Sequence, residues 1–494
     1  MKKKQMPPIL YWLNNLIIFS IFFKKIENSK LDVDLLKNYI IGLKLCNFNN
    51  CRLWWIMFSQ IASAINKIAK PCDKYVIGEN RFVRESKFSF KKYVTFTCLK
   101  KGTSNRADLE DFIEDDINSE IDSLSRQAYS QQRKFINPQV YKDISTQYLK
   151  EIRYKANNNL LKNFKGMMVV AGDGSDFEIP NFEETREEFN IKDDCLNYRK
   201  PAMAKFSSIM DVLNGFILDG IIGDYHNGEL PLMQENIKNI QNVINPEKTI
   251  FLFDRGYNAL ALYTQLTSLN SYFLVRLRSN TYKKERKSIT EKDSEIKIKI
   301  TGKRLSLFKD TDLKKEYKGE NYLKLRIVTY TLDNNEKETF LTNLPPETFT
   351  YEDIYKLYGM RWGIETNYNT MKNRLNIENY SGKKRLSIEQ DIYAKFLCYN
   401  IFQFAESYLT NLINSKKRKK GVKQKYKIDQ AHLIRKLKKY LPKMINNPTH
   451  DNVRKYLKKL IDSCLKSPNR DKKSKSRKRK KPQIRKFNMN YRPT

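Results

Sequence analysis

The sequence predicts an α/β protein: a mixed sheet flanked by helices and interrupted by a β-rich insertion, with a helical N-terminal region and a basic C-terminal tail. Three observations lead to this fold class. Helical periodicity dominates residues 1–155, short β-type runs alternate with helical segments from residue 166, and lysine and arginine dominate the C-terminal end. A chain of 494 residues with 40% hydrophobic content can form at least one sizeable core, in about two to four domains.

Residues 1–155 are predicted to form a helical N-terminal region. "LDVDLLKNYIIGLKL" (31–45) and "LEDFIEDDINSEIDSL" (109–124) carry apolar residues at helical spacing, and the second is followed at once by the basic segment "SRQAYSQQRKFINPQVYKDI". Acidic and basic helical faces side by side indicate a small bundle.

The apolar stretch 9–23 resembles part of a secretory signal or a membrane helix. It contains two asparagines, lacks a cleavage-type site, precedes two lysines and is shorter than the roughly 20 residues of a spanning helix. The favoured interpretation is a buried or partner-facing helix, with no membrane association.

Residues 156–280 are predicted to form the first part of an α/β domain. "MMVVAG" is a short apolar strand ending in a turn, and "KFSSIMDVLNGFILDGII" is a hairpin around Asn214–Gly215, a strong turn signal. A helix over 230–244, the strand "TIFLF", a helix over 258–268 and the strand "SYFLVRLR" follow. This order predicts the mixed sheet with helices on its faces.

Residues 281–346 are predicted to form the β-rich insertion, because "SEIKIKI", "YLKLRIVTYTL" and "ETFLTNL" are β-type runs separated by charged turns. The α/β domain resumes over 347–411 with one helix, "FTYEDIYKLYGMRWGIETNYNTMKNRL", for which Thr350 and Asp353 form a near capping box. The remaining segment, 412–494, is predicted to be helical in patches and then disordered. Its stretch 466–486 holds twelve Lys or Arg and one acid, a composition typical of an arm that contacts phosphates without reading sequence.

The charge indicates the partner. Lys and Arg number 93 against 55 Asp and Glu, a formal net charge of +38, which favours a polyanion such as nucleic acid. Solvated lysine faces or binding to a membrane surface are the alternatives. Seven scattered cysteines without a C-x-x-C pair exclude a disulfide framework and a cysteine zinc site, so we expect a cytoplasmic protein.

One stretch of the predicted helix gathers reactive side chains. At about 100° per residue, Tyr358, Arg361, Glu365 and Lys372 share an arc of about 60°. The alternative is an ordinary solvated stripe whose Arg361–Glu365 pair contributes only ~0.2–0.5 kcal/mol. Gly359 and Gly363, which are unfavourable inside a helix, suggest the close approach of another backbone or a ligand.

Two further carboxylates follow predicted strands. Asp173 comes after "MMVVAG" and Asp254 after "TIFLF", each before a glycine-containing turn. Each alone could be ordinary turn chemistry. Together with Glu365 they could hold two metal ions about 3.5–4 Å apart for phosphoryl transfer on a polynucleotide. Magnesium prefers such hard oxygen ligands. Three other acids near β-type runs, Asp176, Asp211 and Asp224, leave the choice of the first ligand open, with Asp173 preferred because the predicted strand ends there.

These residues carry a family resemblance. "DGS" after a strand, "DRGY" after a second strand and the spacing Tyr358-x2-Arg361-x3-Glu365-x6-Lys372 resemble the signature of DDE transposases of bacterial insertion sequences, in the group with a Y-R-E-K motif (insertion-sequence family four). The resemblance covers about residues 123–410. The Y-R-E-K spacing is the specific part, whereas "DGS" alone is weak.

The resemblance implies a ribonuclease H-like core in which Asp173, Asp254 and Glu365 bind two Mg²⁺ ions, with Mn²⁺ as a possible substitute. It implies cleavage at the element's ends and strand transfer by the freed 3′-hydroxyl. The expected partners are double-stranded DNA, as element ends and target, and a second copy of the chain, as a homodimer in the synaptic complex. The helical region 1–155 would bind DNA, and residues 156–280 and 347–411 would form the catalytic domain. A hairpin at the element's end is one possible route. Contacts to the DNA end would come from Tyr358, Arg361, Trp362 and Lys372. The alternatives are a metal-dependent nuclease without joining activity and an inactive DNA-binding relic.

Overall fold

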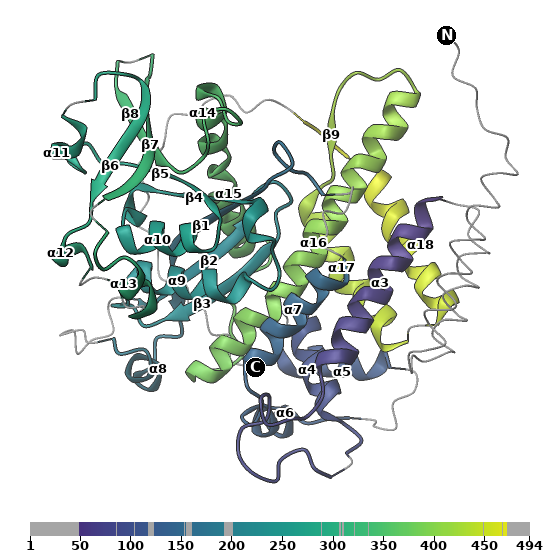
Figure 1. The fold of residues 1–494 in the computed structure, drawn as a ribbon. Coiled ribbons are helices and arrows are strands. Elements are labelled where there is room, and N and C mark those ends of the chain that lie inside the picture. The colour runs from purple at the N-terminus through teal and green to yellow at the C-terminus, as the bar shows by residue number, and fades with distance from the viewer. Residues whose placement is uncertain are drawn as a thin grey trace, which may run out of the picture.

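The computed structural model of the chain describes residues 49–471, except 85, 103, 117–122, 153, 155–160, 192–200, 288, 306–307, 309–310, 321, 334, 448 and 467 (Figure 1). The apolar stretch 9–23, the helix predicted over 31–45 and the end of the basic tail after residue 471 lie outside the described residues. Figure 1 shows two packed parts, one built on a central sheet and one built of helices.

Within the described residues, eight strands form one mixed sheet in the order β3-β2-β1-β4-β5-β8-β7-β6. β4 and β5 run parallel to β1, whereas the β1–β2, β2–β3, β5–β8, β8–β7 and β7–β6 pairs are antiparallel. The predicted mixed sheet flanked by helices is therefore confirmed. The strand bounds are β1 Met168–Ile179, β2 Ala202–Asp211, β3 Ile217–Gly223, β4 Thr249–Phe253, β5 Tyr272–Arg276, β6 Asp293–Lys299, β7 Tyr322–Thr331 and β8 Lys337–Thr342.

The first strand is longer than predicted. The sequence indicated a turn directly after "MMVVAG", but β1 continues through Asp173 to Ile179. The prediction was wrong because β2 pairs with β1 along Val170–Ile179, which satisfies the backbone groups of the expected turn. β4, on the other side, pairs with β1 only as far as Gly172. Asp173 therefore lies where one neighbouring strand ends and the other continues.

The predicted hairpin around Asn214–Gly215 is present between β2 and β3. Gly215 adopts φ 79°, the left-handed conformation that favours glycine. Asp211 stabilises the turn by accepting hydrogen bonds from the backbone N–H groups of Leu213 and Asn214, at 2.9 and 3.0 Å. The local turn chemistry was sufficient to predict this element.

The strands of the predicted insertion extend the central sheet. β6, β7 and β8 coincide with the three β-type runs between residues 281 and 346. β8 pairs antiparallel with β5, so these strands continue the sheet at that edge.

Helices cover both faces of the sheet. Two of them pack against β1, the strand that carries Asp173. α9 (Glu229–Ile240) packs on β1, β2 and β3, and α15 (Trp362–Asn373) packs on β1. A Cβ at Gly172 would lie 2.6 Å from Met233 Sδ of α9, so the glycine permits this close packing. The other elements around the sheet are α8 Glu183–Glu188, η2 Pro246–Lys248, η3 Arg255–Tyr257, α10 Leu260–Ser268, α11 Lys283–Arg286, α12 Gly302–Leu305, α13 Thr311–Glu316 and α14 Tyr351–Met360.

The helical part is joined to the sheet by α16 (Arg385–Lys419), a helix of 35 residues. α16 contacts α4 and α7 as well as β3, so it packs between the helices and the sheet (Figure 1). The other elements of this part are α3 Asn49–Ile68, α4 Phe90–Leu99, α5 Asn105–Glu114, α6 Arg126–Arg133, α7 Gln139–Glu151, α17 Gln430–Asn446 and α18 His450–Lys466, with the short strands β9 Tyr426–Lys427 and β10 Asn469–Arg470.

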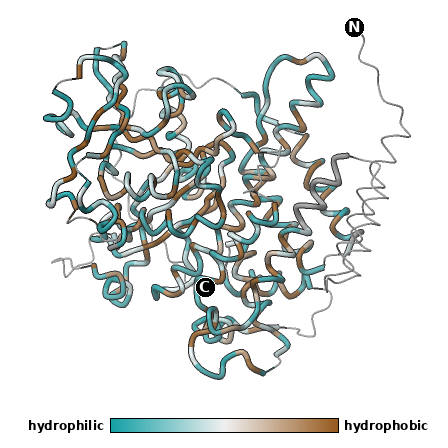
Figure 2. Tube along the Cα trace, viewed as in Figure 1, coloured by the Kyte–Doolittle hydropathy of each residue, from teal (hydrophilic) through white to brown (hydrophobic). Residues whose placement is uncertain are grey.

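Hydrophobic residues lie mainly inside these two parts. Figure 2 shows brown stretches along the central strands and on helices between the two parts, while the end of α16 that projects from the fold is teal. That end carries Lys416, Lys417, Arg418 and Lys419 in its last turn. None of the helices among the described residues has the length and apolar character needed to cross a membrane.

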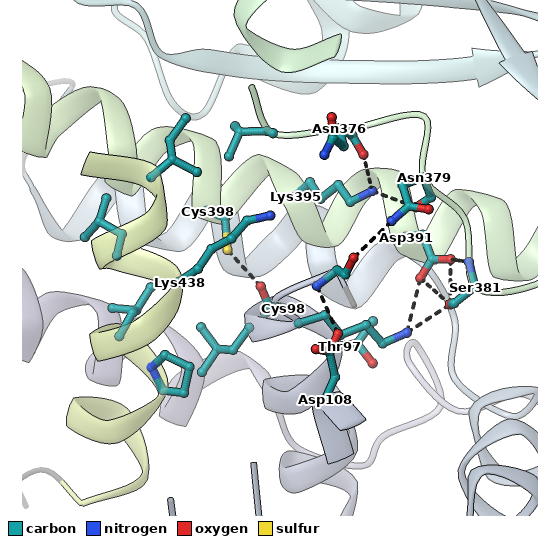
Figure 3. A pocket seen from close by; sticks show the side chains of 18 of the residues that line it. Thr97, Cys98, Asp108, Asn376, Asn379, Ser381, Asp391, Lys395, Cys398 and Lys438 are labelled. Atoms are coloured by element: carbon teal, nitrogen blue, oxygen red, sulfur yellow. Dashed lines mark hydrogen bonds and ion pairs between the residues drawn. The ribbon is translucent and has the colours of Figure 1, made fainter. Parts of the chain in front are cut away.

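A cavity of about 90 Å³ lies where α4, α16 and α17 meet the segment that follows α15 (Figure 3). Lys395 of α16 donates hydrogen bonds to the backbone carbonyls of Asn376, Ile377 and Asn379, at 2.9, 3.1 and 2.8 Å. Burial lowers the pKa of Lys395 to about 8. Through these bonds the helical part holds the chain directly after α15, and so helps to position that helix on the sheet.

A buried ion pair secures the same segment. Arg133 of α6, 3% exposed, donates to Asp391 of α16 at 3.1 Å and to Ser381 Oγ at 2.6 Å. The backbone N–H of Ser381 donates to Asp391 at 2.7 Å. Despite the burial of Asp391, Arg133 and Lys100 hold the pKa of its carboxyl well below its usual range. The carboxylate is therefore ionised and fully engaged at neutral pH.

The variant Arg133→Met is expected to lower the free energy of unfolding by ~3–5 kcal/mol, because it leaves a buried carboxylate without its main counter-charge. Urea denaturation measures the change. Arg106→Met is the matched control, since Arg106 pairs with Glu110 on the exposed surface of α5 and its loss should leave stability nearly unchanged. Equal effects of the two substitutions would contradict the structural role of Arg133.

Candidate active site

The three acids of the predicted constellation come from three elements that meet beside the carboxyl end of β4, a strand in the middle of the sheet. Asp173 lies on β1 and Asp254 directly follows β4. Because β1 and β4 are parallel and Gly172 pairs with Phe253, the two aspartates occupy neighbouring positions across the strands. Glu365 lies in the first turn of α15, which packs on β1.

Arg361 lies between two of these acids. Its Nη2 donates to Glu365 Oε1 at 2.9 Å, and its Nη1 lies 4.0 Å from Asp173 Oδ2. The residue is 6% exposed, and its Nε is buried without a hydrogen-bond partner among the described residues. The guanidinium is thus a cation within the acid cluster, and only some of its N–H groups donate hydrogen bonds.

Tyr358 connects the third acid to the same helical segment. Its hydroxyl donates to Asp254 Oδ1 at 3.3 Å, and its ring lies 4.6 Å from the ring of Phe340 on β8. Burial is the main reason that its pKa is raised to about 12, so the hydroxyl keeps its proton at neutral pH. Tyr358 and Arg361 together contact the side chains of Asp173, Asp254 and Glu365.

The helix that carries these residues differs from the predicted one. The sequence predicted one helix over 349–375, but α14 ends at Met360 and α15 begins at Trp362, with Arg361 at the junction. Arg361 keeps helical dihedral angles, φ −53° and ψ −35°, so the backbone stays in a helical conformation at the junction. The capping box of Thr350 and Asp353 at the start of α14 is confirmed.

The two glycines of this segment have different surroundings. A Cβ on Gly363 would lie 3.1 Å from Cβ of Val212, just after β2, so the expected close approach is present there. Around Gly359 no atom lies within 4 Å of such a Cβ, so none of the described backbone approaches this glycine, and the approach of a ligand there stays a prediction. The close approach of another backbone is present at Gly363.

Tyr368 fixes the backbone beneath Asp173. Its hydroxyl donates to the Asp173 carbonyl oxygen at 2.8 Å and lies 2.7 Å from Ser208 Oγ on β2. Ser208 is the residue paired with Asp173 across β1 and β2. Sequence reasoning did not identify Ser208, since a serine inside a strand has no distinguishing local signal.

The remaining two residues expected to contact DNA lie in different environments. Trp362 is 53% exposed, and its ring centroid lies 5.3 Å from the Arg361 guanidinium. Lys372 is engaged by the protein, because its Nζ donates to the Asp176 carbonyl oxygen at 2.7 Å and lies 3.3 Å from Glu378 Oε1. Trp362 therefore faces solvent, while Lys372 ties α15 to β1.

The three alternative acids have partners of their own. Asp176 pairs with Lys205 at 2.7 Å, and Asp224 pairs with Arg385 at 2.6 Å. Asp211 caps the β2–β3 turn and accepts a hydrogen bond from the Tyr154 hydroxyl. Of the four aspartates considered for the first position, Asp173 is the one within 4.0 Å of Arg361.

The cluster concentrates negative charge in a half-buried place. The pKa of Asp173 is raised to about 6, mainly by burial; the Gly174 N–H and Arg361 oppose this shift, and the carboxylates of Asp254 and Glu365 contribute to it. Asp173 is therefore largely ionised at pH 7 and becomes protonated below about pH 6.

Two further side chains, those of Glu229 and Tyr257, lie near the part of β1 that carries Asp173. A Cβ on Gly174 would lie 3.0 Å from the carboxyl carbon of Glu229, at the start of α9. Tyr257 is buried, and its hydroxyl has no hydrogen-bond partner among the described residues. Asp173 is among the charges that raise its pKa above the usual range, after burial itself. Sequence reasoning singled out neither side chain, although Tyr257 ends the "DRGY" segment.

The donor set of the cluster is chemically suited to Mg²⁺, which prefers carboxylate oxygens. In the arrangement described for residues 49–471, no three His, Cys, Asp or Glu side chains are close enough to hold one metal ion together. The cation that interacts with both Asp173 and Glu365 is the guanidinium of Arg361.

Comparison with known protein families gives a direct match for the part of the chain that contains these residues. Residues 165–401 match the family described as the transposase DDE domain. This match supports a DDE transposase. It agrees with the resemblance of the sequence to DDE transposases. The matched range includes β1, β4, α14 and α15, and so all three acids of the cluster.

No curated protein matches the chain. Among solved structures, one described as the cryo-EM structure of the piggyBac transposase synaptic complex with hairpin DNA is similar, with 12% sequence identity, coverage of 85% of each chain and a TM-score of 0.39.

Proposed function

We propose that this protein is a DNA transposase that binds the ends of an insertion sequence and performs metal-dependent strand cleavage and strand transfer. The observation that carries the proposal is the meeting of Asp173, Asp254 and Glu365, through Tyr358 and Arg361, inside the segment that matches the transposase DDE domain. The Y-R-E-K spacing supports assignment to insertion-sequence family four.

A ribonuclease H-like core is part of this proposal. It is supported by three antiparallel strands, β1 to β3, followed in space by the parallel strands β4 and β5, and by acids at β1, after β4 and on a later helix. This arrangement brings together carboxylates that are far apart in the sequence. Asp173 and Asp254 are separated by 81 residues (254 − 173), and Asp254 and Glu365 by 111 (365 − 254).

Asp173, Asp254 and Glu365 would hold two Mg²⁺ ions, with Mn²⁺ as a substitute. When bound, such ions activate the attacking oxygen and stabilise the leaving oxygen of an in-line phosphodiester displacement. The protein's own residues orient this chemistry. Tyr368 holds the backbone at Asp173, and the Tyr358 hydroxyl donates to Asp254, which restricts how these two carboxylates turn.

In the cleavage step, a water oxygen forms a bond to the phosphorus and the bond to the 3′ oxygen breaks, leaving a 3′-hydroxyl. In strand transfer, that hydroxyl attacks a phosphodiester of the target, and the displaced oxygen leaves with the proton. Both steps replace one P–O bond by another and need no external energy source.

DNA would be held close to the acids by Tyr358, Arg361, Trp362 and Lys372, and by the large positive charge of the chain. Trp362 has the exposure that base stacking needs, a contact that contributes ~1–3 kcal/mol in proteins that bind single strands. Pairing of two element ends would require two protomers.

An assay on DNA that carries the element's ends tests the proposal. Incubation of the full chain with an end-labelled duplex and Mg²⁺ should release a fragment with a 3′-hydroxyl, and an added supercoiled plasmid should become covalently joined to that fragment. Cleavage without joining would instead support a nuclease. Binding without any cleavage, in Mg²⁺ and in Mn²⁺ alike, would identify an inactive DNA-binding relic.

A further inference from the structure

The position of Arg361 has a consequence for how metal and DNA bind. Its guanidinium lies 2.9 Å from Glu365 and 4.0 Å from Asp173, which are two of the three carboxylates assigned to the metal in the proposed function. A cation at this place neutralises the charge that would attract a metal ion. Arginine does not lose its proton in proteins, so only a movement of the side chain can remove this charge.

Two features show that the guanidinium is incompletely held. Its Nε is buried without a partner, although it is a strong donor. Its contact with Asp173 is longer than a hydrogen bond. The guanidinium lies beside the exposed ring of Trp362, at the junction of α14 and α15. A DNA phosphate bound next to Trp362 would therefore be close to it.

A phosphate diester offers what this site lacks. Two phosphate oxygens can accept from the Nε and an Nη of one guanidinium at the same time, a paired geometry that arginine forms readily. Movement of Arg361 to a phosphate would satisfy its unpartnered Nε. The same movement would leave Asp173 and Glu365 without their resident cation.

We propose that Arg361 couples DNA binding to metal binding: in the free protein its guanidinium competes with the metal for Asp173 and Glu365, and a DNA phosphate draws it away. This inference rests on the proposed function and adds an order to it, since the metal site becomes available when DNA is bound. Binding energies are linked reciprocally, so Mn²⁺ should strengthen DNA binding by the same factor by which DNA strengthens Mn²⁺ binding.

Mn²⁺ binding to the full chain, followed by electron paramagnetic resonance with and without a short random-sequence duplex, tests the coupling. We expect Arg361→Gln to bind Mn²⁺ about tenfold more tightly than the unsubstituted chain in the absence of DNA, because a nearby positive charge is lost. Addition of the duplex should strengthen Mn²⁺ binding to the unsubstituted chain and have no further effect on the variant.

Arg255→Gln is the matched control. Arg255 is exposed and adjacent to Asp254 in the sequence, so this variant loses the same charge near the cluster without removing the guanidinium between the acids. It should bind Mn²⁺ like the unsubstituted chain and keep the effect of DNA. Arg361→Lys keeps a cation at the position and should also bind Mn²⁺ weakly without DNA, which provides a second test if the Gln variant does not fold.

The outcomes separate this inference from the proposed function. Mn²⁺ binding that is the same in Arg361→Gln and in the unsubstituted chain, or a gain shared by Arg255→Gln, would overturn the coupling and leave the transposase proposal in place. An unsubstituted chain that binds no Mn²⁺ with or without DNA would overturn both.

Discussion

Replacement of Glu365 by glutamine abolishes metal-dependent strand cleavage, with an expected loss of ~10³-fold or more, while DNA binding stays as strong or becomes stronger. Glutamine keeps the size of the side chain but removes the charge that a metal ligand needs. It also removes a negative charge that repels DNA phosphates. The measurement is the rate of cleavage of an end-labelled duplex carrying the element's end, with binding followed separately by gel shift.

Asp173→Asn and Asp254→Asn should have effects of the same size. Asp176→Asn is the matched control, because Asp176 lies on the same strand as Asp173 but pairs with Lys205 at 2.7 Å. This variant should cleave at close to the normal rate. A normal rate for Asp173→Asn combined with an inactive Asp176→Asn would move the first ligand to Asp176, and a normal rate for Glu365→Gln would remove Glu365 from the mechanism.

We expect DNA binding by this protein to decrease steeply with salt, by about 10³–10⁵-fold between 50 and 200 mM if six to ten phosphates are contacted. The reason is the release of counterions from DNA by a chain with a formal net charge of +38. Fluorescence anisotropy of a labelled duplex across a salt series measures the slope. A flat dependence would be incompatible with an extended phosphate interface.

The basic tail holds eleven Lys and Arg residues between 467 and 486. A chain that ends at residue 466 lacks them and is compared with the full chain. Its salt dependence should be shallower, and its affinity should decrease equally for element ends and for random DNA, because phosphate contacts carry no sequence information. Loss of affinity for one sequence alone would show that the tail reads bases.

Local signals predicted several elements correctly because the interactions that form them span only a few residues. The Asn214–Gly215 turn needs a residue that tolerates positive φ, and the start of α14 needs the Thr350–Asp353 capping box. Both features are written in adjacent positions. The β-type runs that became β6, β7 and β8 were recognised for the same reason.

The candidate site was accessible only in part. The residue types and spacing of Asp254, Arg361 and Glu365 were visible in the sequence, as was the uncertainty between Asp173 and its neighbours. The length of β1, which moved Asp173 from a turn into a strand, depended on pairing with β2 some 30 residues later. Pairing between distant segments leaves no mark in a local pattern.

The amino-acid sequence alone determined the strongly basic character, the order of helices and strands around the three acids, and the set of acids from which a metal site could be built. The tertiary structure decided which of these groups meet. Arg361 lies between Asp173 and Glu365, Lys372 donates a hydrogen bond to the backbone of β1, and Trp362 is exposed. The physical reason is that charge and periodicity are sums over neighbouring residues, whereas an ion pair or a buried donor depends on packing between segments far apart in the chain.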